Sequence, residues 1–419
     1  MNDIKEKADY CLSCKNKPCM NGCPLCNDVT EFIKCVKEEK YDEAYKIATE
    51  TSVLQSVCGR ICPHMSQCEG KCVRGIKQVP VSIGDIEAFI GDKAIEESFS
   101  MKELPKVKEN YNVAIVGGGP AGLTCAAFLE RRGIHTTIFE KYNELGGILR
   151  HGIPEFRLPR ETLDKCINKI LNLGIDVEYG KELGKNIDLD YLKNNYDYVF
   201  LAIGANISWK MDIPGEELDG VFGGNELLER GNHPNYSGKT VIVSGGGNVA
   251  MDCARTVKRL GAKSVKVVYR RSEEQMPAER KEIEDAKKDG VEFNFQNNIL
   301  KIYGKNKVNG VECIRTNLVK KEGDTRLSPV NIEGSNYNIE ADYVIMAIGS
   351  TVEEDVINKT GLERNKKGYI QVNNYVTSDS KVFAGGDVIG EKSTVAWAAK
   401  NGRDVAEIII NKIGEGTNE

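Results

Sequence analysis

The sequence predicts an α/β protein with two βαβ domains, one inserted into the other, preceded by a small helical domain. Three observations support this organisation. Ten of the fourteen cysteines lie in the first 72 residues, and glycine-rich turns follow short apolar strands at two places farther along. Two similar strings, YVFLAIGA (198–205) and YVIMAIGS (343–350), bracket the second of these turns. We expect the helical domain at 1–105, the outer βαβ domain at 106–235 with 341–419, and the inserted one at 236–340.

Composition excludes several classes of protein. The 419 residues are 40% hydrophobic and 28% charged, and no apolar run approaches the roughly 20 residues that a bilayer requires. The net charge of −5 argues against a nucleic-acid partner, which would need a concentrated basic face. The N-terminus has no apolar leader, so we expect a soluble cytoplasmic protein without a membrane partner. In that compartment thiols stay reduced, so we expect the cysteines to serve metal or redox chemistry.

The cysteines near the N-terminus form two groups. The first is a C-x2-C-x4-C-x3-C-P array close to bacterial ferredoxin spacing, made of Cys11, Cys14, Cys19 and Cys23. The second is made of Cys58, Cys62, Cys68 and Cys72. The spacing predicts iron–sulfur clusters, with the cysteine before the proline serving the other cluster. Two zinc sites or a dithiol at Cys11 and Cys14 are the alternatives. For Cys26, Cys35 and Cys58 we favour packing or incidental thiols near the clusters over a ligand role.

The segment between the two groups has a helical period of apolar residues, which begins Val29, Phe32, Ile33, Val36. We expect two short helices over 29–57. They would bring the two cysteine groups together.

The first glycine-rich turn fits a dinucleotide site. Gly117, Gly119 and Gly122 form G-x-G-x-x-G after an apolar strand, and Glu140 ends the next strand, where an acid accepts ribose hydroxyl groups. This pattern fits FAD or NAD rather than a 2′-phosphate. Pro120, Ala121 and Lys141 are the adjoining candidates for cofactor binding.

The second turn repeats this design with a different ending. Gly245, Gly247 and Ala250 form G-x-G-x-x-A, with Asn248 beside them, but the following strand ends in Arg270 and Arg271. Guanidinium groups at that place suit the 2′-phosphate of NADP. The alternative is a solvated basic strand end.

A third glycine turn near the C-terminus, AGGDV, precedes a helix. Gly386 and Asp387 lie on the turn, and the helix is expected to open at about Thr394, followed by Ala396 and Trp397. An acid there can bind the ribityl or pyrophosphate part of FAD, and a helix N-terminus favours negative charge on the reduced flavin. Asp387 is otherwise an ordinary turn residue.

These motifs together resemble the glutamate synthase small (beta) subunit family, which is related to the large subunit of NADH-dependent ferredoxin:NADP oxidoreductase and to the N-terminal half of dihydropyrimidine dehydrogenase. The strings that carry the resemblance are CGRICP, GGGPAGL, ELGGILRHGIPEFRLP, GGGNVAMDCAR, YRRSEEQMPA and AGGDV. The resemblance implies two [4Fe–4S] clusters, one held by Cys11, Cys14, Cys19 and Cys72, the other by Cys23, Cys62, Cys68 and an acid or amide. The matching position is Glu87, one residue closer to Cys72 than in the family. The resemblance also places Gly146, Gly147 and Arg150 at the flavin.

The expected function is therefore electron transfer. NADPH would reduce FAD by hydride transfer between cofactors, without a catalytic side chain, and two clusters would pass single electrons to a large partner subunit. Alternatives are the large subunit of a ferredoxin-linked NAD(P) transhydrogenase complex, a thioredoxin-reductase-like disulfide reductase, and a scaffold whose cofactors are structural. Glutamate synthesis would require a large partner subunit, since the sequence has no recognisable amidotransferase or FMN domain.

Overall fold

A computed structural model describes residues 2–107, 110–231, 233–320 and 326–416. The chain forms two compact units. The first comprises Met1–Arg150, Glu155–Ala205 and Val352–Glu419, and the second comprises His151–Pro154 and Asn206–Thr351. Among the described residues, no helix combines the length and the apolar character needed to cross a bilayer.

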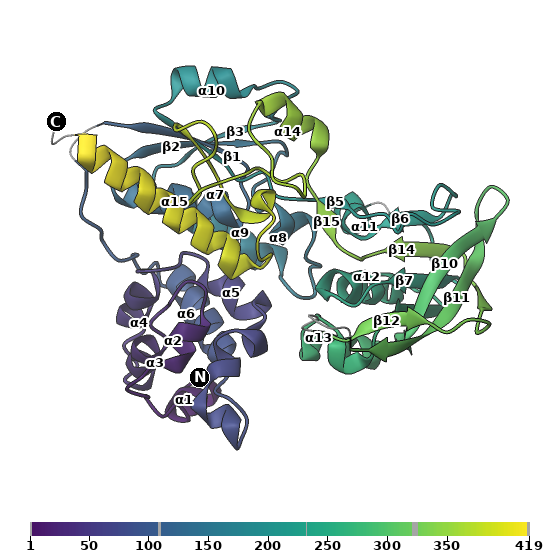
Figure 1. Ribbon diagram of the computed structural model, residues 1–419. Helices are drawn as coiled ribbons and strands as arrows, with labels where there is room; N and C mark the ends of the chain where they lie inside the picture. Colours follow the sequence, from purple (N-terminus) through teal and green to yellow (C-terminus); the bar gives the residue numbers. More distant parts are fainter. Residues whose placement is uncertain (1, 108–109, 232, 321–325, 417–419) are drawn as a thin grey trace. The chain divides into compact units, whose positions relative to one another are not determined.

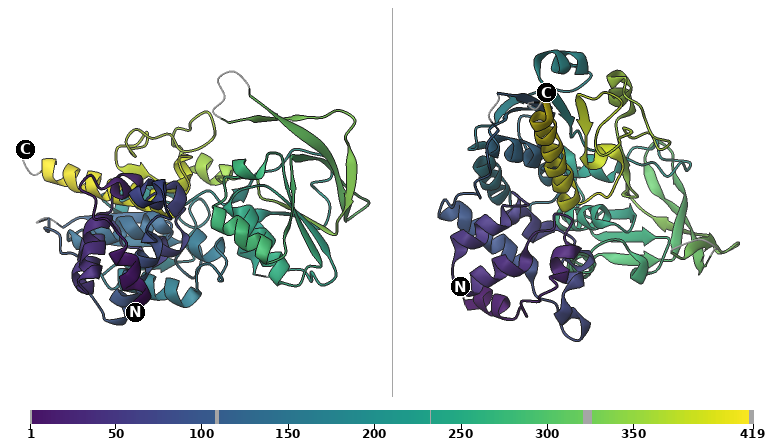
Figure 2. Two further views of the ribbon diagram at one scale, coloured as in Figure 1. Left: turned by 90° about the horizontal axis from the view of Figure 1, so that it is seen from below. Right: turned by 60° about the vertical axis from the view of Figure 1, so that its left-hand side comes forward.

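The N-terminal part of the first unit is built from short helices, shown in purple in Figures 1 and 2. They are α1 (Asn2–Asp9), α2 (Pro18–Gly22), α3 (Val29–Lys37), α4 (Tyr41–Ala48), α5 (Gln55–Ile61) and α6 (Ile83–Glu96), with 3₁₀ turns η1 (His64–Ser66), η2 (Glu69–Lys71) and η3 (Val73–Ile76). The predicted helical period is confirmed as α3 and α4. Helix α3 buries Val29, Phe32 and Val36 on one face, and its N-terminus is capped by the Asp28 carboxylate, which accepts a hydrogen bond from the Glu31 N–H.

The rest of the first unit is a parallel sheet with the strand order β16-β4-β1-β2-β3. The strands are β1 (Asn112–Val116), β2 (His135–Glu140), β3 (Asp176–Tyr179), β4 (Tyr198–Leu201) and β16 (Val382–Ala384). The central strand β1 is buried from Val113 to Val116, as expected for a parallel strand that is covered on both faces. Helix α7 (Pro120–Arg131) follows it, and the C-terminal helix α15 (Val395–Gly416) packs along α7 (Figure 1). The remaining helices are α8 (Ile148–His151), α9 (Arg160–Leu171), α10 (Leu189–Asn195) and α14 (Glu354–Thr360), with the 3₁₀ turn η5 (Gly386–Ile389).

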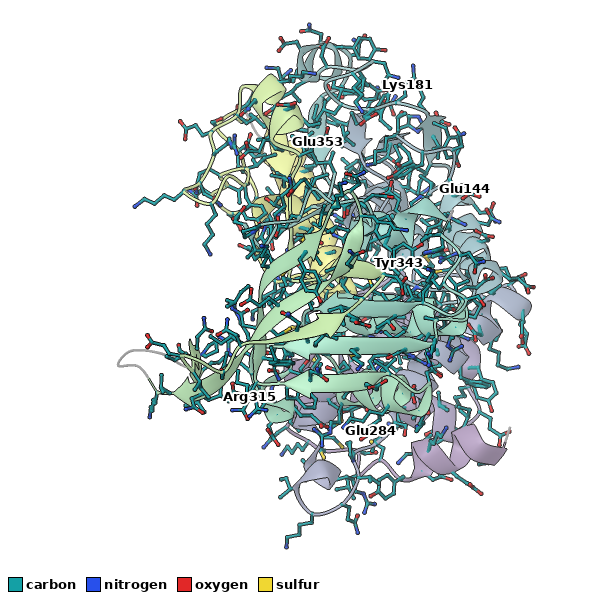
Figure 3. All side chains as sticks on the ribbon, turned by 90° about the vertical axis from the view of Figure 1, so that its right-hand side faces the viewer. Glu144, Lys181, Glu284, Arg315, Tyr343 and Glu353 are labelled. Atoms are coloured by element: carbon teal, nitrogen blue, oxygen red, sulfur yellow. The ribbon has the colours of Figure 1, made fainter. Side chains whose placement is uncertain are left out.

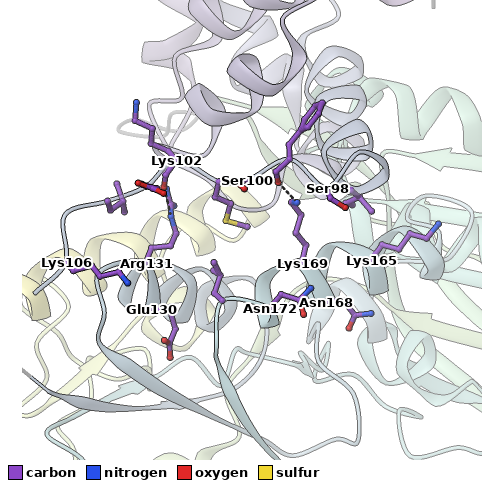
Figure 4. Close-up of a pocket in the computed structure, with 16 residues that line it drawn as sticks. Ser98, Ser100, Lys102, Lys106, Glu130, Arg131, Lys165, Asn168, Lys169 and Asn172 are labelled. Carbon is purple, nitrogen blue, oxygen red and sulfur yellow. Dashed lines mark hydrogen bonds between the residues drawn. The ribbon is translucent and has the colours of Figure 1, made fainter.

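Two cations, one buried and one half-buried, attach the helical region to this sheet. The buried Arg131 on α7 donates to the carbonyl oxygens of Thr49 (2.9 Å) and Lys102 (2.6 Å), and Lys169 on α9 donates to those of Ala94 (3.1 Å) and Phe99 (2.5 Å). Figure 4 shows both side chains in the cavity that they line. Burial lowers the pKa of Arg131 to about 10. Because these cations already bind backbone carbonyls, the cavity is a structural junction.

The second unit contains another parallel sheet, with the order β6-β14-β7-β8-β9. Its strands are β6 (Val221–Gly223), β7 (Thr240–Ser244), β8 (Ser264–Tyr269), β9 (Glu292–Phe295) and β14 (Tyr343–Met346), and its helices are α11 (Gly224–Arg230), α12 (Asn248–Arg259), α13 (Arg280–Lys288) and the 3₁₀ turn η4 (Glu273–Gln275). An antiparallel sheet adds β10 (Asn297–Gly304), β11 (Val308–Val319), β12 (Ser328–Asn331) and β13 (Tyr337–Glu340), and a short pair joins β5 (Ile207–Ser208) to β15 (Ser350–Thr351). In Figure 3, Tyr343 marks β14 and Arg315 marks β11.

The inserted unit is larger than the range 236–340 that the sequence predicted. Strands β6 and β14 lie outside that range, but both pair in the second sheet, so the chain leaves the first unit after Ala205 and returns at Val352. The sequence motifs in 236–340 locate only the nucleotide turn of the inserted unit. The edge of its parallel sheet is formed by β6, which pairs with β14 more than a hundred residues away, and no local motif marks that pairing. The two similar strings contain β4 and β14, and the crossings after Ala205 and before Val352 each follow one of them.

The contact between α15 and α7 allows a stability prediction. A Cβ atom on Gly402 would lie 2.1 Å from the Ala121 carbonyl oxygen, whereas a Cβ on Gly414, in the same helix, meets nothing within 4 Å. Gly402→Ala should therefore destabilise the first unit by about 2 kcal/mol through overpacking. Gly414→Ala should stabilise it by up to about 1 kcal/mol through helix propensity. Thermal unfolding monitored by circular dichroism measures both, and equal shifts for the two variants would contradict the packing.

Candidate functional site: glycine turns and two thiol groups

The first glycine turn is shaped by contacts within the protein at two of its three glycines. Gly117 has a φ of +104°, and a Cβ there would lie 2.5 Å from the Ala202 carbonyl oxygen. A Cβ on Gly122 would lie 2.0 Å from the carbonyl oxygen of Gly117. Gly119 differs, because its φ is −81° and the nearest atom to a Cβ there is the Gly147 Cα at 3.9 Å. Neither strain nor packing within the chain explains a glycine at 119, which leaves close approach of a ligand as its physical reason.

The second turn repeats this arrangement. Gly245 has a φ of +142°, and a Cβ there would lie 2.1 Å from the Ala347 carbonyl oxygen. Gly247 has a φ of −91°, and a Cβ there would meet no atom within 4 Å. Asn248 begins α12 and its Oδ1 accepts the Glu279 N–H at 2.9 Å, which ties the turn to the segment after β8. The third motif position, Ala250, is fully buried.

Glu140 lies at the end of β2, against the first turn. Its buried carboxylate accepts the N–H groups of Gly118 (2.8 Å) and Tyr142 (2.9 Å), and burial raises its pKa. Each carboxylate oxygen keeps a further lone pair, so ribose hydroxyl groups can still bind. The neighbouring Lys141 extends over the Tyr142 ring, with its Nζ 4.6 Å from the ring centroid. Pro120 and Ala121 occupy the buried first turn of α7.

The segment ELGGILR lies against the same turn. The Gly146 N–H donates to the Gly118 carbonyl at 2.9 Å, and Gly146 and Gly147 have φ values of +125° and +50°. Arg150 donates to the Leu145 carbonyl oxygen at 2.7 Å and pairs with Asp164. The structure thus brings Gly119 and Gly147 face to face at a point where no side chain intervenes, as a cofactor cradle requires.

The third predicted element lies where β16 meets α15. Asp387 is partly buried, and desolvation raises its pKa. Gly386 has a φ of +76° and its N–H donates to Asn401 Oδ1 at 2.8 Å, which fixes the turn to α15. The Thr394 Oγ1 accepts the Trp397 N–H at 3.3 Å and caps the helix. Ala396 is buried in the first turn.

Three cysteines of the first group line one pocket together with Cys72, and we call this pocket the first cysteine pocket and its four cysteines the first thiol group. Cys11, Cys14, Cys19 and Cys72 all line it, although Cys72 lies more than fifty residues from the others. Thr30, Ile33 and Val81 complete its walls. The Cys72 sulfur accepts the Val81 N–H and the Cys11 sulfur accepts the Ser13 N–H. Backbone N–H donors of this kind stabilise thiolate ligands.

The remaining four predicted ligands lie together in a more buried place. Glu87 interacts electrostatically with Cys23, Cys62 and Cys68, so Cys23 lies near the other three residues. Burial, aided by Glu69, raises the pKa of Glu87 to about 8. Burial and the charge of Glu87 raise the pKa of Cys23 to about 12 and that of Cys68 well above its ordinary value.

Four acids gathered in a buried place need a compensating positive charge to ionise together. A coordinated metal core supplies that charge and deprotonates thiols outright. The donor set therefore fits an iron–sulfur cluster. Among the residues that the structure describes, no group of three or more His, Cys, Asp or Glu side chains is arranged to hold a metal ion by itself. Cys58, which lies outside the implied ligand set, shares a hydrogen bond with Cys62.

Two contacts connect the second thiol group to α15. The Gln67 side-chain amide donates to Thr394 Oγ1 at 3.3 Å, and Gln67 directly precedes Cys68. Arg403 donates to the Leu25 carbonyl oxygen at 2.6 Å, two residues after Cys23. The helix that begins at the predicted flavin turn is thus attached to the loops that carry this group.

The basic end of β8 holds one feature that sequence reasoning missed. Arg270 is exposed, and the Arg271 Nε donates to the Leu327 carbonyl oxygen at 3.0 Å. Arg326 lies beside the Tyr269 hydroxyl and the Gln275 carbonyl, and with Lys320 it lines a pocket next to this strand end. Lys320 and Arg326 lie between β11 and β12, about fifty residues beyond Arg270 in the sequence. The local spacing of residues around β8 therefore could not predict them.

Comparisons with known proteins agree with this arrangement. Residues 111–402 match the family model for pyridine nucleotide-disulphide oxidoreductase, and residues 1–99 match that for dihydropyrimidine dehydrogenase domain II, 4Fe-4S cluster. The glutamate synthase [NADPH] small chain of Escherichia coli (strain K12) is 37% identical over 97% of this chain and 91% of that protein. The NADPH-Fe(3+) oxidoreductase subunit beta of Geobacter sulfurreducens is 35% identical over 95% of this chain and 64% of that protein.

A solved structure shares the fold. Mycobacterium tuberculosis FprA, in complex with NADPH, has a TM-score of 0.64 at 20% identity, covering 74% of this chain and 86% of that one. This likeness concerns the fold alone.

The middle glycines of the two turns give a prediction that separates binding from folding. Gly119→Ala should leave the unfolding temperature unchanged and lower the FAD content of the purified protein. Gly247→Ala should likewise keep the unfolding temperature and raise the KM for NADPH by about tenfold, the cost of roughly 1.4 kcal/mol of lost binding. Flavin absorbance, steady-state kinetics and thermal unfolding measure these effects. The matched control is Gly245→Ala, which should destabilise the second unit through the Ala347 contact. A lower unfolding temperature in Gly247→Ala would contradict the assignment of Gly247 to binding and Gly245 to folding.

Proposed function

Because the chain belongs to the glutamate synthase small-chain family of NADPH-dependent flavin and iron–sulfur oxidoreductases, we propose that it carries electrons from NADPH through FAD and two [4Fe–4S] clusters to a separate partner protein. The glutamate synthase large subunit is the partner that the relatives' names favour. The single observation that carries the proposal is the separation of eight donor side chains into two groups, one of which is attached to α15.

The chain's own residues bind, orient and shield the cofactors. When bound, FAD accepts a hydride and releases electrons singly, and iron–sulfur clusters carry single electrons. Gly119 and Gly147 carry no side chain where their backbones meet, which leaves the surface of the turn open to a pyrophosphate, and Glu140 orients the adenosine ribose. The N-terminus of α15 offers N–H groups and a positive dipole to the edge of the flavin where negative charge develops. Asp387 holds the ribityl side.

The second nucleotide site selects NADPH by charge. Gly247 opens the phosphate turn at the start of α12, and Arg270 and Arg271 at the end of β8 receive the 2′-phosphate. Arg326 and Lys320 add two cations from beside the antiparallel sheet to the same place. A dianionic 2′-phosphate gains from each of them, whereas the 2′-hydroxyl of NADH does not.

The two thiol groups form the path out of the protein. Cys23, Cys62, Cys68 and Glu87 would hold the cluster that lies nearer the flavin helix, because Gln67 and Arg403 join their loops to α15. Cys11, Cys14, Cys19 and Cys72 are less buried and would hold the cluster nearer the surface. Each cluster would supply one-electron transfer. No side-chain acid or base takes part, since a hydride moves between cofactors.

A second candidate differs only in the partner. The NADPH-Fe(3+) oxidoreductase subunit beta and the NADP(+)-dependent formate dehydrogenase subunit beta of Moorella thermoacetica are 35% and 34% identical over nearly the whole chain. Their names favour a subunit of another redox complex. A ferredoxin-linked NAD(P) transhydrogenase complex belongs to this second candidate, because the same parts support electron flow in either direction. Isolation of the native complex and identification of its partner chain distinguish the two.

The cofactor content tests the proposal directly. Protein purified without oxygen should contain about eight irons and one FAD per chain, as two four-iron clusters require, and NADPH should bleach the flavin absorbance. Cys62→Ser should lower the iron content to about four and remove one cluster signal from the electron paramagnetic resonance spectrum. Cys26→Ser, at an exposed thiol outside both groups, is the matched control. Zinc without sulfide, or a flavin that NADPH does not bleach, would refute the proposal.

The coenzyme preference has its own test. The double variant Arg270→Ala with Arg271→Ala should raise the KM for NADPH at least tenfold, which corresponds to roughly 1.4 kcal/mol, and leave the KM for NADH nearly unchanged. Arg326→Ala should shift the preference in the same direction by a smaller factor. Steady-state kinetics with ferricyanide as acceptor measures both constants. Equal increases for the two coenzymes would exclude a 2′-phosphate role.

A further inference from the structure

Four large apolar side chains are exposed together on the helical region. The exposed fractions are 50% for Leu12, 39% for Val73, 77% for Ile76 and 74% for Val79. Single exposed apolar residues are common on protein surfaces, but a group of them marks a binding surface. We call these four residues the apolar patch.

The apolar patch is continuous with the first cysteine pocket. Leu12 and Val73 line that pocket together with its four cysteines. Tyr10 connects Val79 to the segment that carries Leu12. Its hydroxyl donates to the Val79 carbonyl oxygen at 3.1 Å, and its own carbonyl oxygen accepts a hydrogen bond from the Arg74 Nε at 3.0 Å. Ile76 ends the 3₁₀ turn that begins at Val73. The patch therefore includes two residues of the pocket wall and extends from them along the segment that follows Cys72.

Positive charge borders the apolar patch. Lys15, Lys71, Arg74 and Lys77 lie in the same two segments, while Glu69 is the one acid within 69–80, and its carboxylate accepts the Gly84 N–H. Within the described part of the chain, Lys15, Lys71 and Lys77 have no carboxylate partner. Arg74 stacks over the Tyr10 ring, 4.2 Å from its centroid. This local excess of cations stands on a chain whose net charge is −5.

We propose that the apolar patch is the docking surface for an acidic protein that carries single electrons. The proposal rests on the proposed function, in which electrons leave through the first thiol group. An apolar centre with a charged rim is the usual anatomy of a transient protein interface, and the cations steer an acidic partner to it. The same surface could attract an anionic membrane, but a bilayer takes no electrons from the pocket that the patch adjoins.

Two protein acceptors of opposite charge test the proposal. The probes are rubredoxin, a small acidic iron protein, and basic mitochondrial cytochrome c. Each NADPH oxidised to NADP⁺ releases one proton and reduces two acceptor molecules from Fe(III) to Fe(II). The holoenzyme should reduce rubredoxin with a kcat/KM at least tenfold above that for cytochrome c. Raising the salt concentration from about 10 mM to about 100 mM, which shortens the Debye length from about 30 Å to about 10 Å, should lower the rubredoxin value severalfold.

Variants assign the effect to the apolar patch. Ile76→Asp with Val79→Asp should lower kcat/KM for rubredoxin at least tenfold and weaken its binding in isothermal titration calorimetry, a readout that needs no turnover. Both side chains are largely exposed, so the unfolding temperature should not change. Val330→Asp, at an exposed apolar position on β12 of the second unit, is the matched control and should have no effect.

The outcomes separate this proposal from the proposed function. Ferricyanide reduction and flavin bleaching by NADPH should be equal in wild type and variant, and their loss in wild type would refute the electron-transfer function itself. The docking proposal is overturned by normal rubredoxin reduction in the variant, by absence of rubredoxin reduction in wild type, or by equal rates with cytochrome c. Patch-dependent sedimentation with phosphatidylglycerol vesicles, or a patch-dependent dimer in analytical ultracentrifugation, would also overturn it.

Discussion

A steric constraint at the end of the first strand underlies both nucleotide-binding units. At Gly117 and at Gly245 the chain turns at positive φ directly against a carbonyl oxygen at the exit of the neighbouring strand, that of Ala202 in one sheet and that of Ala347 in the other. Any side chain at these two positions would push the strands apart. Because the turn is this tight, each following helix starts at the strand end with its N–H groups aimed at the same opening, which is where a phosphate binds. The repeated AIG strings are the partners of these turns.

Burial of ionisable groups is the second constraint, and it acts in the helical region. Burial removes water from thiols and carboxyl groups and raises their pKa, so they stay protonated unless a positive charge lies close to them. Among the described residues, the charges that act most strongly on Cys23, Cys68 and Glu87 belong to carboxylates and thiols. The folded region is thus poised for a cationic core, and folding and cofactor assembly are coupled there.

The link between the helical region and the flavin domain makes electron transfer physically reasonable. Arg131 and Lys169 fasten the connecting segment to the sheet through carbonyl oxygens, and Gln67 and Arg403 fasten the ligand loops to α15. Each contact uses a backbone or neutral partner rather than a surface ion pair, so salt weakens it little. These contacts attach both the connecting segment and the ligand loops to the helices α7, α9 and α15 of the same unit.

Much of this protein was predictable from its sequence because the chemistry depends on local spacing. The G-x-G-x-x-G and G-x-G-x-x-A turns and the helical period after Cys23 are each contained in a few dozen residues, where backbone geometry alone decides which side chains face one site. Tertiary structure decided the rest. The pairing of β6 and β14 in the second sheet, the approach of Lys320 and Arg326 to β8, and the exposure of Ile76 and Val79 near the first cysteine pocket depend on contacts between distant segments, and a linear pattern has no period that records them.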